Sequence, residues 1–243
     1  MDYYNFLKNR FSEDFFKGKK TKESAIEKAY SDMSRRAAGH KPEMKEKCVE
    51  WLSYKVFNTE LPDITSEEAF DEWHKKTCEE LKSKCEMFGT IGRSQKVINM
   101  AFKYLSCVDD TYDHVLPYCH MTLDSYTLNW YKTIISEKEK KNLKEWSKID
   151  DYENEYYSIQ KKIREHLKDN QQYFVTIGSA ESSSIALPTI PFEAEFVIWE
   201  GEIIKVKYNT IIKELNNYKN KGKEKDEWLI GQMFDDYLND YDL

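Results

Sequence analysis

SQKVINMAFKYLSCV, residues 94–108, is the stretch of the sequence that decides the fold. Apolar side chains occupy nearly every face of the helix that it predicts, whereas a helix at the surface carries them on one side only. We therefore expect a central buried helix near residues 94–108, enclosed by the rest of the chain. Its apolar positions are Val97, Ile98, Met100, Ala101, Phe102, Tyr104 and Leu105.

Amphipathic segments lie on both sides of this helix. Apolar residues recur in them every three to four positions, and Thr21, Pro42 and Thr65 or Ser66 are typical helix-starting residues. Residues 109–120 and 171–191 are expected to be loops, 192–199 is compact and apolar, and the charged stretch 137–170 predicts one or two surface helices. The remaining predicted helices cover residues 2–17, 21–38, 42–57, 67–87, 124–135, 203–218 and 225–238.

Composition favours the same fold class. Gly (8) and Pro (5) are scarce among 243 residues, whereas all-β chains need many tight turns. The hydrophobic fraction of 40% excludes a disordered chain, and the charged fraction of 33% is typical of helices with one solvated face. We predict an all-α fold with a single domain over 1–243, in which Gly89 and Gly92 also allow a subdivision into 1–88 and 89–243.

The net charge of −7 is unevenly distributed along the chain. Residues 1–50 carry 12 Lys and Arg against 9 Asp and Glu, and residues 221–243 carry 3 Lys against 7 acids. The acidic total argues against non-specific binding of nucleic acid, yet the basic N-terminal part allows a polyanion to bind on one face. Alternatively, these charges only solvate helix faces.

The cysteines indicate a reducing compartment. Their number is odd, they form no compact framework, and the N-terminal MDYY is unlike a signal peptide. No apolar stretch approaches the length of a membrane span. We therefore expect a soluble cytoplasmic protein without a membrane partner, whose thiols are all reduced. The five are Cys48, Cys78, Cys85, Cys107 and Cys119.

The strongest candidate for a chemical site begins at a glycine turn. In FGTIGRSQK, Gly89 and Gly92 lead into the central helix, whose first turn holds Gln95 and Lys96. Burial beside an apolar core and the positive end of the helix dipole both favour a neutral amine there. A neutral lysine amine can act as a nucleophile and form a Schiff base. Asp124 begins the next predicted helix, where it can cap the backbone or stabilise a cationic partner.

This order of glycine turn, lysine-bearing helix and later aspartate resembles the helix-hairpin-helix DNA glycosylase superfamily. The segment Leu116-Pro117 … Leu123-Asp124-Ser125 is most similar to the archaeal 8-oxoguanine glycosylase branch. Two departures are that Lys96 stands four residues after Gly92 rather than two, and that the usual Leu-Pro-Gly-Val-Gly hairpin is absent. The resemblance implies that Lys96 is the nucleophile, that Asp124 is the catalytic carboxylate and that DNA is the partner.

A second resemblance covers more of the same region. The central helix has the pattern QK-x-x-N-x-x-x-K-Y-L, His120 and Asp124 give H-x-x-x-D, and residues 191–199 read PFEAEFVIW. Together these motifs are similar to a family of uncharacterised bacterial helical proteins, which implies a helical fold but no activity.

A polar stripe runs along the otherwise apolar central helix. Lys96, Asn99 and Lys103 share one side of it, and buried polar groups need partners, which Asp124 or Glu195 can supply. The stripe is therefore either a buried network or the wall of a pocket. We predict that the binding residues of the site are Gln95, Asn99, Lys103, His120, Glu195 and Trp199.

His120 and Asp124 stand four residues apart, so on a helix they would share a face and could bind a metal or act as an acid–base pair. Cys107, His114 and Cys119 nearby match no zinc spacing, and a Cys119–His120 pair lacks a third residue to orient it. We expect a structural histidine, and neither a metal nor a cofactor. Aromatic residues can stack on bases or belong to the core; they are Trp130, Tyr131, Tyr156, Tyr157 and Trp199.

Two functions remain open from the sequence. The first is a nucleic-acid-directed protein that resembles a base-excision glycosylase and acts through Lys96 and Asp124. The alternative is a non-enzymatic helical protein that binds another protein of unknown identity, in which both residues are structural. The two differ in whether Lys96 and Asp124 meet at an open cleft or are buried and satisfy each other.

Overall fold

The computed structural model of the chain describes residues 3–16, 20–34, 42–57, 61, 64–84, 88–175 and 183–220. These residues are predominantly helical, which confirms the predicted all-α class, and the sheet among them is a two-stranded hairpin. The elements are α1 (Tyr3–Phe15), α2 (Lys22–Ser34), α3 (Pro42–Phe57), α4 (Glu67–Lys84), α5 (Ile91–Leu105), α6 (Ser125–Ile134), α7 (Glu137–Asn142), α8 (Ser158–Asp169), β1 (Gln172–Val175), β2 (Ser183–Ala186) and α9 (Pro191–Asn220).

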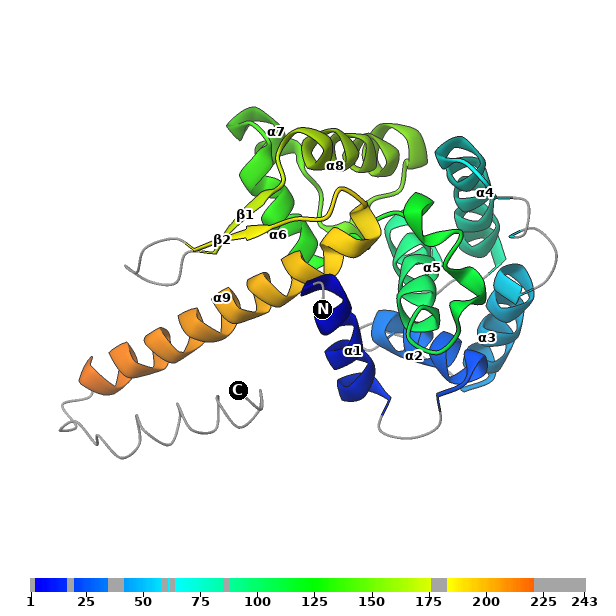
Figure 1. Cartoon of the computed structure of the whole chain (residues 1–243), viewed down its shortest axis with the longest axis horizontal. Coiled ribbons are helices and arrows are strands. Elements are labelled where there is room, and N and C mark those ends of the chain that lie inside the picture. Colours follow the sequence, from blue (N-terminus) through cyan, green and yellow to red (C-terminus); the bar gives the residue numbers. More distant parts are fainter. Residues whose placement is uncertain are drawn as a thin grey trace.

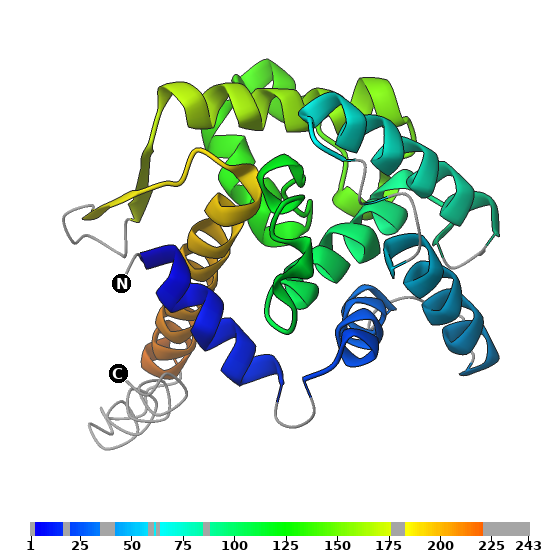
Figure 2. The same ribbon diagram turned by 45° about the vertical axis from the view of Figure 1, so that its right-hand side comes forward.

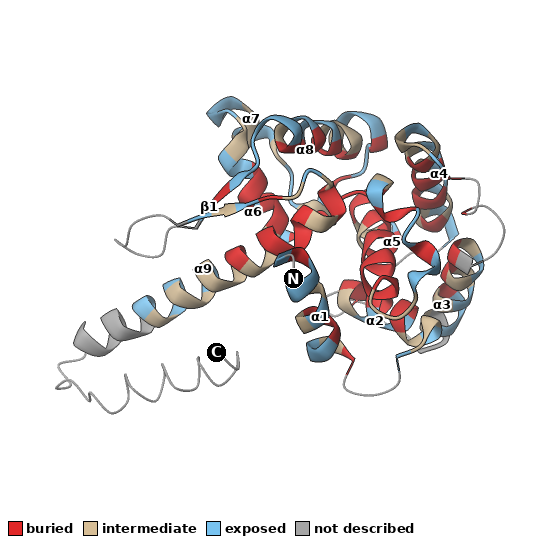
Figure 3. Ribbon diagram, in the orientation of Figure 1, coloured by how far each residue is buried: buried red, intermediate tan, exposed pale blue. Residues whose placement is uncertain are grey.

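Helix α5 lies at the centre of the molecule, as its apolar pattern predicts (Figure 1). It begins three residues earlier than expected because Thr90 caps it, with the Thr90 Oγ1 accepting a hydrogen bond from the Arg93 amide at 3.3 Å. Every residue of α5 except Arg93 and Lys96 is buried (Figure 3). Helices α2 and α4 both pack against α5, so one core includes residues from both sides of position 88.

Gly92 lies inside the first turn of α5 and not in a turn before it. A Cβ at this position would stand 1.7 Å from the Trp146 carbonyl oxygen, so only glycine lets the two backbone segments meet. The Gly92 amide also donates a hydrogen bond to the Ile149 carbonyl at 2.9 Å. Gly92 thereby fixes the 3-10 turn Trp146–Lys148 against the start of α5.

The helices before α5 begin where the sequence predicts. Thr21 and Ser24 exchange hydrogen bonds between amide and hydroxyl at the start of α2, which forms a reciprocal cap. Helix α3 begins at Pro42, and the Ser66 hydroxyl accepts from the Ala69 amide at the start of α4. The predicted helix ends at 38 and 87, and the predicted helix 225–238, lie outside the described residues.

The charged stretch 137–170 is more interrupted and more buried than the one or two surface helices predicted. It contains α7, the 3-10 turn Trp146–Lys148, and a π-helical turn over Tyr152–Tyr157 that continues into α8. Apolar residues spaced by about one turn give α8 a buried face in spite of its charge, because only one side of a helix needs to be apolar for it to pack on a core.

The segment 171–191 is not the long loop that its serines and prolines predict. Strands β1 and β2 pair antiparallel, with Tyr173 opposite Ile185 and Phe174 opposite Ser184. Aromatic and β-branched residues favour strands. In β2 only Ile185 is of this kind, and the serines beside it led us to expect a loop.

A single helix, α9, replaces the expected break between residues 192–199 and 203–218. It continues through Gly201, where Tyr173 of β1 packs so closely that a Cβ would stand 2.3 Å from the tyrosine ring. Glycine is needed here for close packing and not for a turn. The first half of α9 packs against α1 and α6, whereas its C-terminal half extends away from the body (Figures 1 and 2).

None of the described helices combines the length and the apolar character that crossing a membrane requires. The cysteines at 48, 78, 107 and 119 are free thiols, and Cys85 lies outside the described residues. Burial raises the pKa of the Cys78, Cys107 and Cys119 thiols, which keeps them protonated and unreactive.

Candidate functional site

The fold brings Lys96 of α5 next to Asp124 at the start of α6. The Lys96 Nζ lies 3.8 Å from the Asp124 Oδ2, and 14% and 11% of the two side chains are exposed. The same Nζ lies 4.6 Å from the centre of the Trp146 ring, which is within the range of a cation–π contact. The pair is thus held from two sides and is not fully enclosed.

Lys96 and Asp124 line a pocket of about 400 Å³ between α1, α2, α5, α6 and α9. This volume is in the range of about 300–1,000 Å³ that is typical of small-molecule sites. Asp32 and Lys103 add two further charges, and the Tyr126 and Trp199 rings meet edge to face at 6.0 Å. The aromatic and methionine side chains of the lining are Phe11, Phe15, Met33, Met100, Tyr126, Trp146 and Trp199.

The two carboxylate oxygens of Asp124 have different partners. Oδ1 accepts hydrogen bonds from the amides of Tyr126 and Thr127 at 2.9 and 3.1 Å, and the Thr127 hydroxyl accepts from the Asp124 amide at 2.9 Å. This capping box starts α6 and fixes the carboxylate in place. Oδ2 remains directed at Lys96, so Asp124 fills its structural role without giving up its second oxygen.

Gln95 lies on the buried side of α5 and not in this pocket. It contacts the segment 119–124, which is buried and belongs to no helix or strand. The Gln95 side chain accepts from the Leu123 amide at 3.2 Å and donates to the Leu123 carbonyl at 2.8 Å, and Gln160 of α8 donates to the Met121 carbonyl at 2.8 Å. Such partners are required because a buried unpaired backbone group costs about 1–3 kcal/mol.

Lys103 and Glu195 form a buried ion pair at the inner end of the pocket. The Lys103 Nζ lies 2.8 Å from the Glu195 Oε1, and only 2% and 3% of the side chains are exposed. The Glu195 Oε2 accepts a hydrogen bond from the Thr122 amide at 2.6 Å. The Lys103 Nζ also lies 4.5–5.1 Å from the ring centres of Phe11, Phe196 and Trp199.

His120 pairs with Asp71 of α4 and not with Asp124. Its Nε2 lies 2.6 Å from the Asp71 Oδ1 and its Nδ1 lies 2.9 Å from the Tyr156 hydroxyl, so both ring nitrogens have partners. Arg164 holds the same Asp71 carboxylate with two hydrogen bonds of 2.9 Å. The condition for a common face of His120 and Asp124 is not met, because residues 119–123 are not helical.

Asn99 links His120 to a second buried histidine. Its Nδ2 donates to the Tyr156 hydroxyl at 3.1 Å, and its Oδ1 lies 3.0 Å from His74 Nε2. The chain Asp71–His120–Tyr156–Asn99–His74 is therefore continuous. Asp71 and His74 were not predicted from the sequence, although a polar residue on the apolar side of the predicted helix 67–87 was a signal for them.

The buried histidines are neutral. Desolvation lowers the pKa of His120 to about 4 and lowers the pKa of His74 well below its ordinary value. Burial alone would raise the pKa of Asp71, but hydrogen bonds from His120, Arg164 and Tyr157 hold it well below its usual range. The network therefore contains an ionised Asp71 paired with Arg164, beside neutral imidazoles.

The remaining residues singled out in the sequence are not brought together. The His114 Nδ1 contacts the Thr111 carbonyl at 2.9 Å, and the Cys119 Sγ lies 3.6 Å from the Val115 carbonyl. Within the part of the chain that the structure describes, no three His, Cys, Asp or Glu side chains are arranged to hold a metal ion. Trp130, Tyr131 and Tyr156 belong to the core, whereas Trp199 lines the pocket of Lys96.

Comparison of the chain with protein-family models, curated proteins and solved structures finds no match.

Proposed function

We propose that the chain is a nucleic-acid-directed protein that receives one base beside Lys96 and Asp124 and cleaves its glycosidic bond, as DNA base-excision glycosylases do. The observation that carries the proposal is a lysine amine and a carboxylate oxygen 3.8 Å apart at the wall of a pocket of about 400 Å³. This is the residue pair that the resemblance to the helix-hairpin-helix superfamily implies.

The shape and chemistry of the pocket suit a planar ring. Trp146, Trp199 and Tyr126 are part of the lining, and stacking of a base on an aromatic side chain contributes about 1–3 kcal/mol. Enzymes that act on a base move it out of the helical stack into such a pocket. Helices α1 and α2 form one wall of this pocket.

The proposed reaction uses the electron pair that the Lys96 Nζ carries once its ammonium has lost a proton to solvent. This pair forms a bond to C1′ of the sugar, while the bond from C1′ to the base breaks and its electrons leave with the base, which takes up a proton. The attached nitrogen loses a proton, for which the Asp124 Oδ2 is the placed acceptor. The nitrogen electron pair then forms a double bond to C1′ while the bond from C1′ to O4′ breaks and O4′ takes up a proton from solvent. The product is a Schiff base, which borohydride reduces to a stable amine.

Trapping of this Schiff base is the direct test. The full-length chain is incubated with borohydride and oligonucleotides that contain 8-oxoguanine, uracil or an abasic site, and covalent adducts are resolved on denaturing gels. We expect an adduct that Lys96→Ala abolishes. We also expect Asp124→Asn to reduce it at least a hundredfold, because asparagine keeps the helix cap but cannot accept the proton.

Lys138→Ala is the matched control, because Lys138 is an exposed lysine of α7 that does not line the pocket. It should trap as the parent does, and all three variants should keep the helical circular dichroism spectrum. Adducts that persist in Lys96→Ala would mean that another lysine reacts. The absence of any adduct with the parent chain on all three substrates would contradict the proposal.

A second function, binding of a partner protein without catalysis, is favoured by α9. Its C-terminal half extends from the body (Figure 1). Val206 and Ile212 in this half are 42% and 37% exposed. The same variants distinguish this function. No trapping in the parent, together with a large loss of stability in Lys96→Ala and Asp124→Asn, would mean that the pair only supports the fold.

A further inference from the structure

A second and larger pocket follows one edge of the β1–β2 hairpin. It has a volume of about 1,120 Å³ and is lined by every residue from 168 to 174, from the end of α8 through most of β1. Successive residues of a strand point to opposite faces of a sheet, so both kinds border one space only where that space lies at the edge of the strand. From β2 only Ser184 and Ala186 contribute, and these two share a face. The pocket is therefore a groove along the outer edge of β1, which we call the β1 groove.

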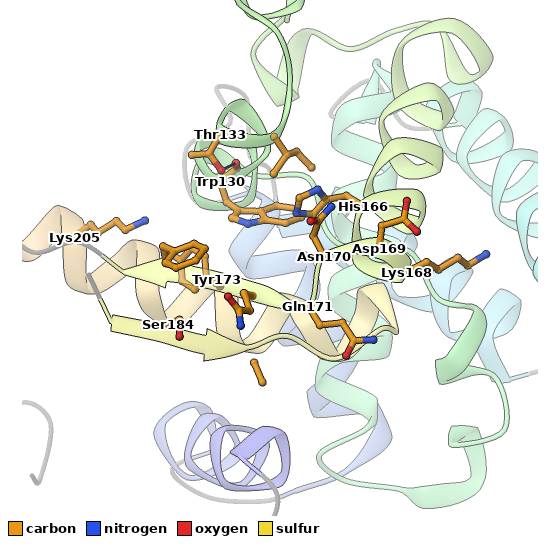
Figure 4. A pocket seen from close by; sticks show the side chains of 14 residues that line it. Trp130, Thr133, His166, Lys168, Asp169, Asn170, Gln171, Tyr173, Ser184 and Lys205 are labelled. Atoms are coloured by element: carbon orange, nitrogen blue, oxygen red, sulfur yellow. Dashed lines mark hydrogen bonds between the residues drawn. The ribbon is translucent and has the colours of Figure 1, made fainter. Parts of the chain in front are cut away.

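Helix α6 forms the far wall of the β1 groove. Trp130, Thr133 and Ile134 line it from one side of α6, because residues three and four apart lie together on a helix. Figure 4 places Lys205 at one end of the groove and Lys168 at the other, with β1 between them. The groove is therefore elongated and bounded on both of its long sides.

The outer edge of β1 offers backbone groups that have no partner in the described part of the chain. The Leu187 amide donates to the Gln171 carbonyl at 2.9 Å, and Gln172 lies opposite Ala186. In an antiparallel pair with this pattern, the amides and carbonyls of Gln172 and Phe174 point away from β2. None of the described residues hydrogen-bonds to these groups. Such an edge is a template for pairing with a further strand.

Contacts with α9 hold this edge in a fixed position. Tyr173 packs on Gly201, and its hydroxyl donates to the Glu202 carboxylate at 2.8 Å. Lys205 donates to the same Glu202 oxygen at 2.8 Å. An isolated two-stranded hairpin is only marginally stable in water, so these contacts give β1 the support that it needs to receive a third strand.

The side chains beside the edge indicate the chemistry of the partner. Phe174 is 56% exposed, and a strand added to β1 places one of its own side chains opposite this ring, where aromatic and β-branched pairs stabilise a sheet. Two lysines, Lys168 and Lys205, line the groove against one acid, Asp169. No described residue forms an ion pair with Lys168, whereas Lys205 is held by Glu202. The groove therefore favours an acidic side chain at the end beside Lys168.

We propose that the β1 groove binds an extended peptide segment of another protein as a third strand, with an aromatic or aliphatic side chain opposite Phe174 and an acidic one beside Lys168. Strand addition takes its affinity from main-chain hydrogen bonds and its specificity from alternate side chains. A single segment suits the groove better than the hairpin of a second copy, which would bring another strand about 5 Å beyond the first, toward the wall formed by α6. This surface goes beyond the proposed reaction and does not depend on it.

Peptides selected on the full-length chain from a random phage-displayed library of eight-residue sequences supply the probes. They are synthesised, and isothermal titration measures their affinity. We expect sequences that alternate in polarity and carry an acid at one end. N-methylation of alternate backbone amides should weaken binding at least tenfold in one of the two possible sets and not in the other, because an added strand donates to its neighbour from every second residue only.

A matched pair of variants locates the binding edge. Proline lacks an N–H and is tolerated on an edge strand where that N–H points outward. Gln172→Pro removes such a group from β1, and Ala186→Pro removes one from β2 at the opposite edge of the hairpin. Gln172→Pro should weaken peptide binding at least tenfold, whereas Ala186→Pro should bind as the parent does. Urea denaturation checks that both variants stay folded, and the N-methylated peptides test the parent chain directly.

Three outcomes would overturn the proposal: no selected peptide binds at millimolar concentration, both N-methylated sets bind like the unmodified peptide, or the two proline variants have equal effects. Self-association of the parent that Gln172→Pro abolishes, measured by sedimentation, would assign the edge to a second copy and also contradict it. Lys96→Ala should bind peptide as the parent does whether or not it abolishes trapping. Failure of the proposed reaction and failure of this surface are therefore distinguishable.

Discussion

Helix α5 contributes the lysines of two lysine–carboxylate pairs, which have similar contacts but differ in how far they are buried. In each, one carboxylate oxygen serves the backbone and the other faces a lysine: Glu195 binds the Thr122 amide and Lys103, and Asp124 caps α6 and faces Lys96. The inner pair is 2.8 Å apart and almost fully buried, whereas the outer pair is 3.8 Å apart and borders the pocket with more than a tenth of each side chain exposed.

This difference separates a structural pair from a candidate reactive one. At 2.8 Å the Lys103 ammonium is hydrogen-bonded, and it also lies 4.5 Å from the centre of the Phe196 ring. At 3.8 Å the Lys96 ammonium gains attraction from Asp124 but no hydrogen bond, so it keeps donor capacity for a ligand. The two lysines lie two turns apart on one helix and each faces a carboxylate. The pairs differ in how far the protein encloses them and not in the groups that form them.

The largest expected effect comes from breaking the inner pair. Lys103→Met keeps the length of the side chain but leaves Glu195 buried without its cation, which should lower the free energy of unfolding by about 3–5 kcal/mol. Urea denaturation measures it. The double variant Lys103→Met/Glu195→Gln should recover part of the loss, because no unpaired charge remains. A loss below about 1 kcal/mol in the single variant would contradict the assignment.

Acid pH should lower the free energy of unfolding through the buried histidines His120 and His74. The unfolded chain protonates His120 near pH 6.5, whereas the folded chain resists protonation down to about pH 4, so stability falls as pH drops below 6.5. At pH 5 this amounts to about 2 kcal/mol for His120, and His74 acts in the same direction. The lowered pKa of Asp71 adds a further loss only below about pH 4.

Urea denaturation at several pH values between 7.5 and 5 checks this dependence. His120→Gln removes one of the two titrating groups, so its unfolding free energy should fall less steeply with pH than that of the parent. Equal slopes in both proteins would mean that His120 is already charged in the folded chain.

Gly92→Ala should disturb the surroundings of Lys96 and leave those of Lys103 unchanged. The new methyl group would meet the Trp146 carbonyl, and forcing the two backbone segments apart costs about 1–3 kcal/mol. Trp146 covers Lys96, so the displacement should also enlarge the pocket of Lys96. Gly201→Ala is the comparison: there the obstacle is the Tyr173 side chain, which can shift, so its loss in urea should be smaller.

The sequence predicted the parts of the fold that depend on local pattern. The burial of α5 follows from apolar residues on all its faces, and the Asp124 cap follows from an acid in front of an apolar segment. Gly92 was interpreted as part of a turn, and a break was expected between residues 199 and 203, because close packing of Gly92 against Trp146 and of Gly201 against Tyr173 leaves no trace in the local sequence.

Contacts between distant residues were beyond local reasoning. His120 and Asp71 are 49 residues apart, and Arg164 and Asp71 are 93 apart, so no spacing rule pairs them. The sequence offered Asp124 or Glu195 as partners of the polar stripe and did not say which lysine each would meet. Only the packing of α9 and of residues 119–124 against α5 assigns Glu195 to Lys103 and leaves Asp124 to Lys96.

The smallest expected effect on stability is that of Lys96→Met, and it is the sharpest test of the comparison. Lys96 makes no hydrogen bond to Asp124, and its side chain borders the pocket with 14% exposed, so its removal should cost about 1 kcal/mol or less. The partner that it leaves behind stays satisfied, since the amides of Tyr126 and Thr127 still bind the Asp124 carboxylate. Lys103→Met, measured in the same urea series, instead leaves the buried Glu195 Oε1 without the ammonium that donates to it. If the two variants lost the same several kcal/mol, the outer pair would be as structural as the inner one, and its suitability for chemistry would be lost with it.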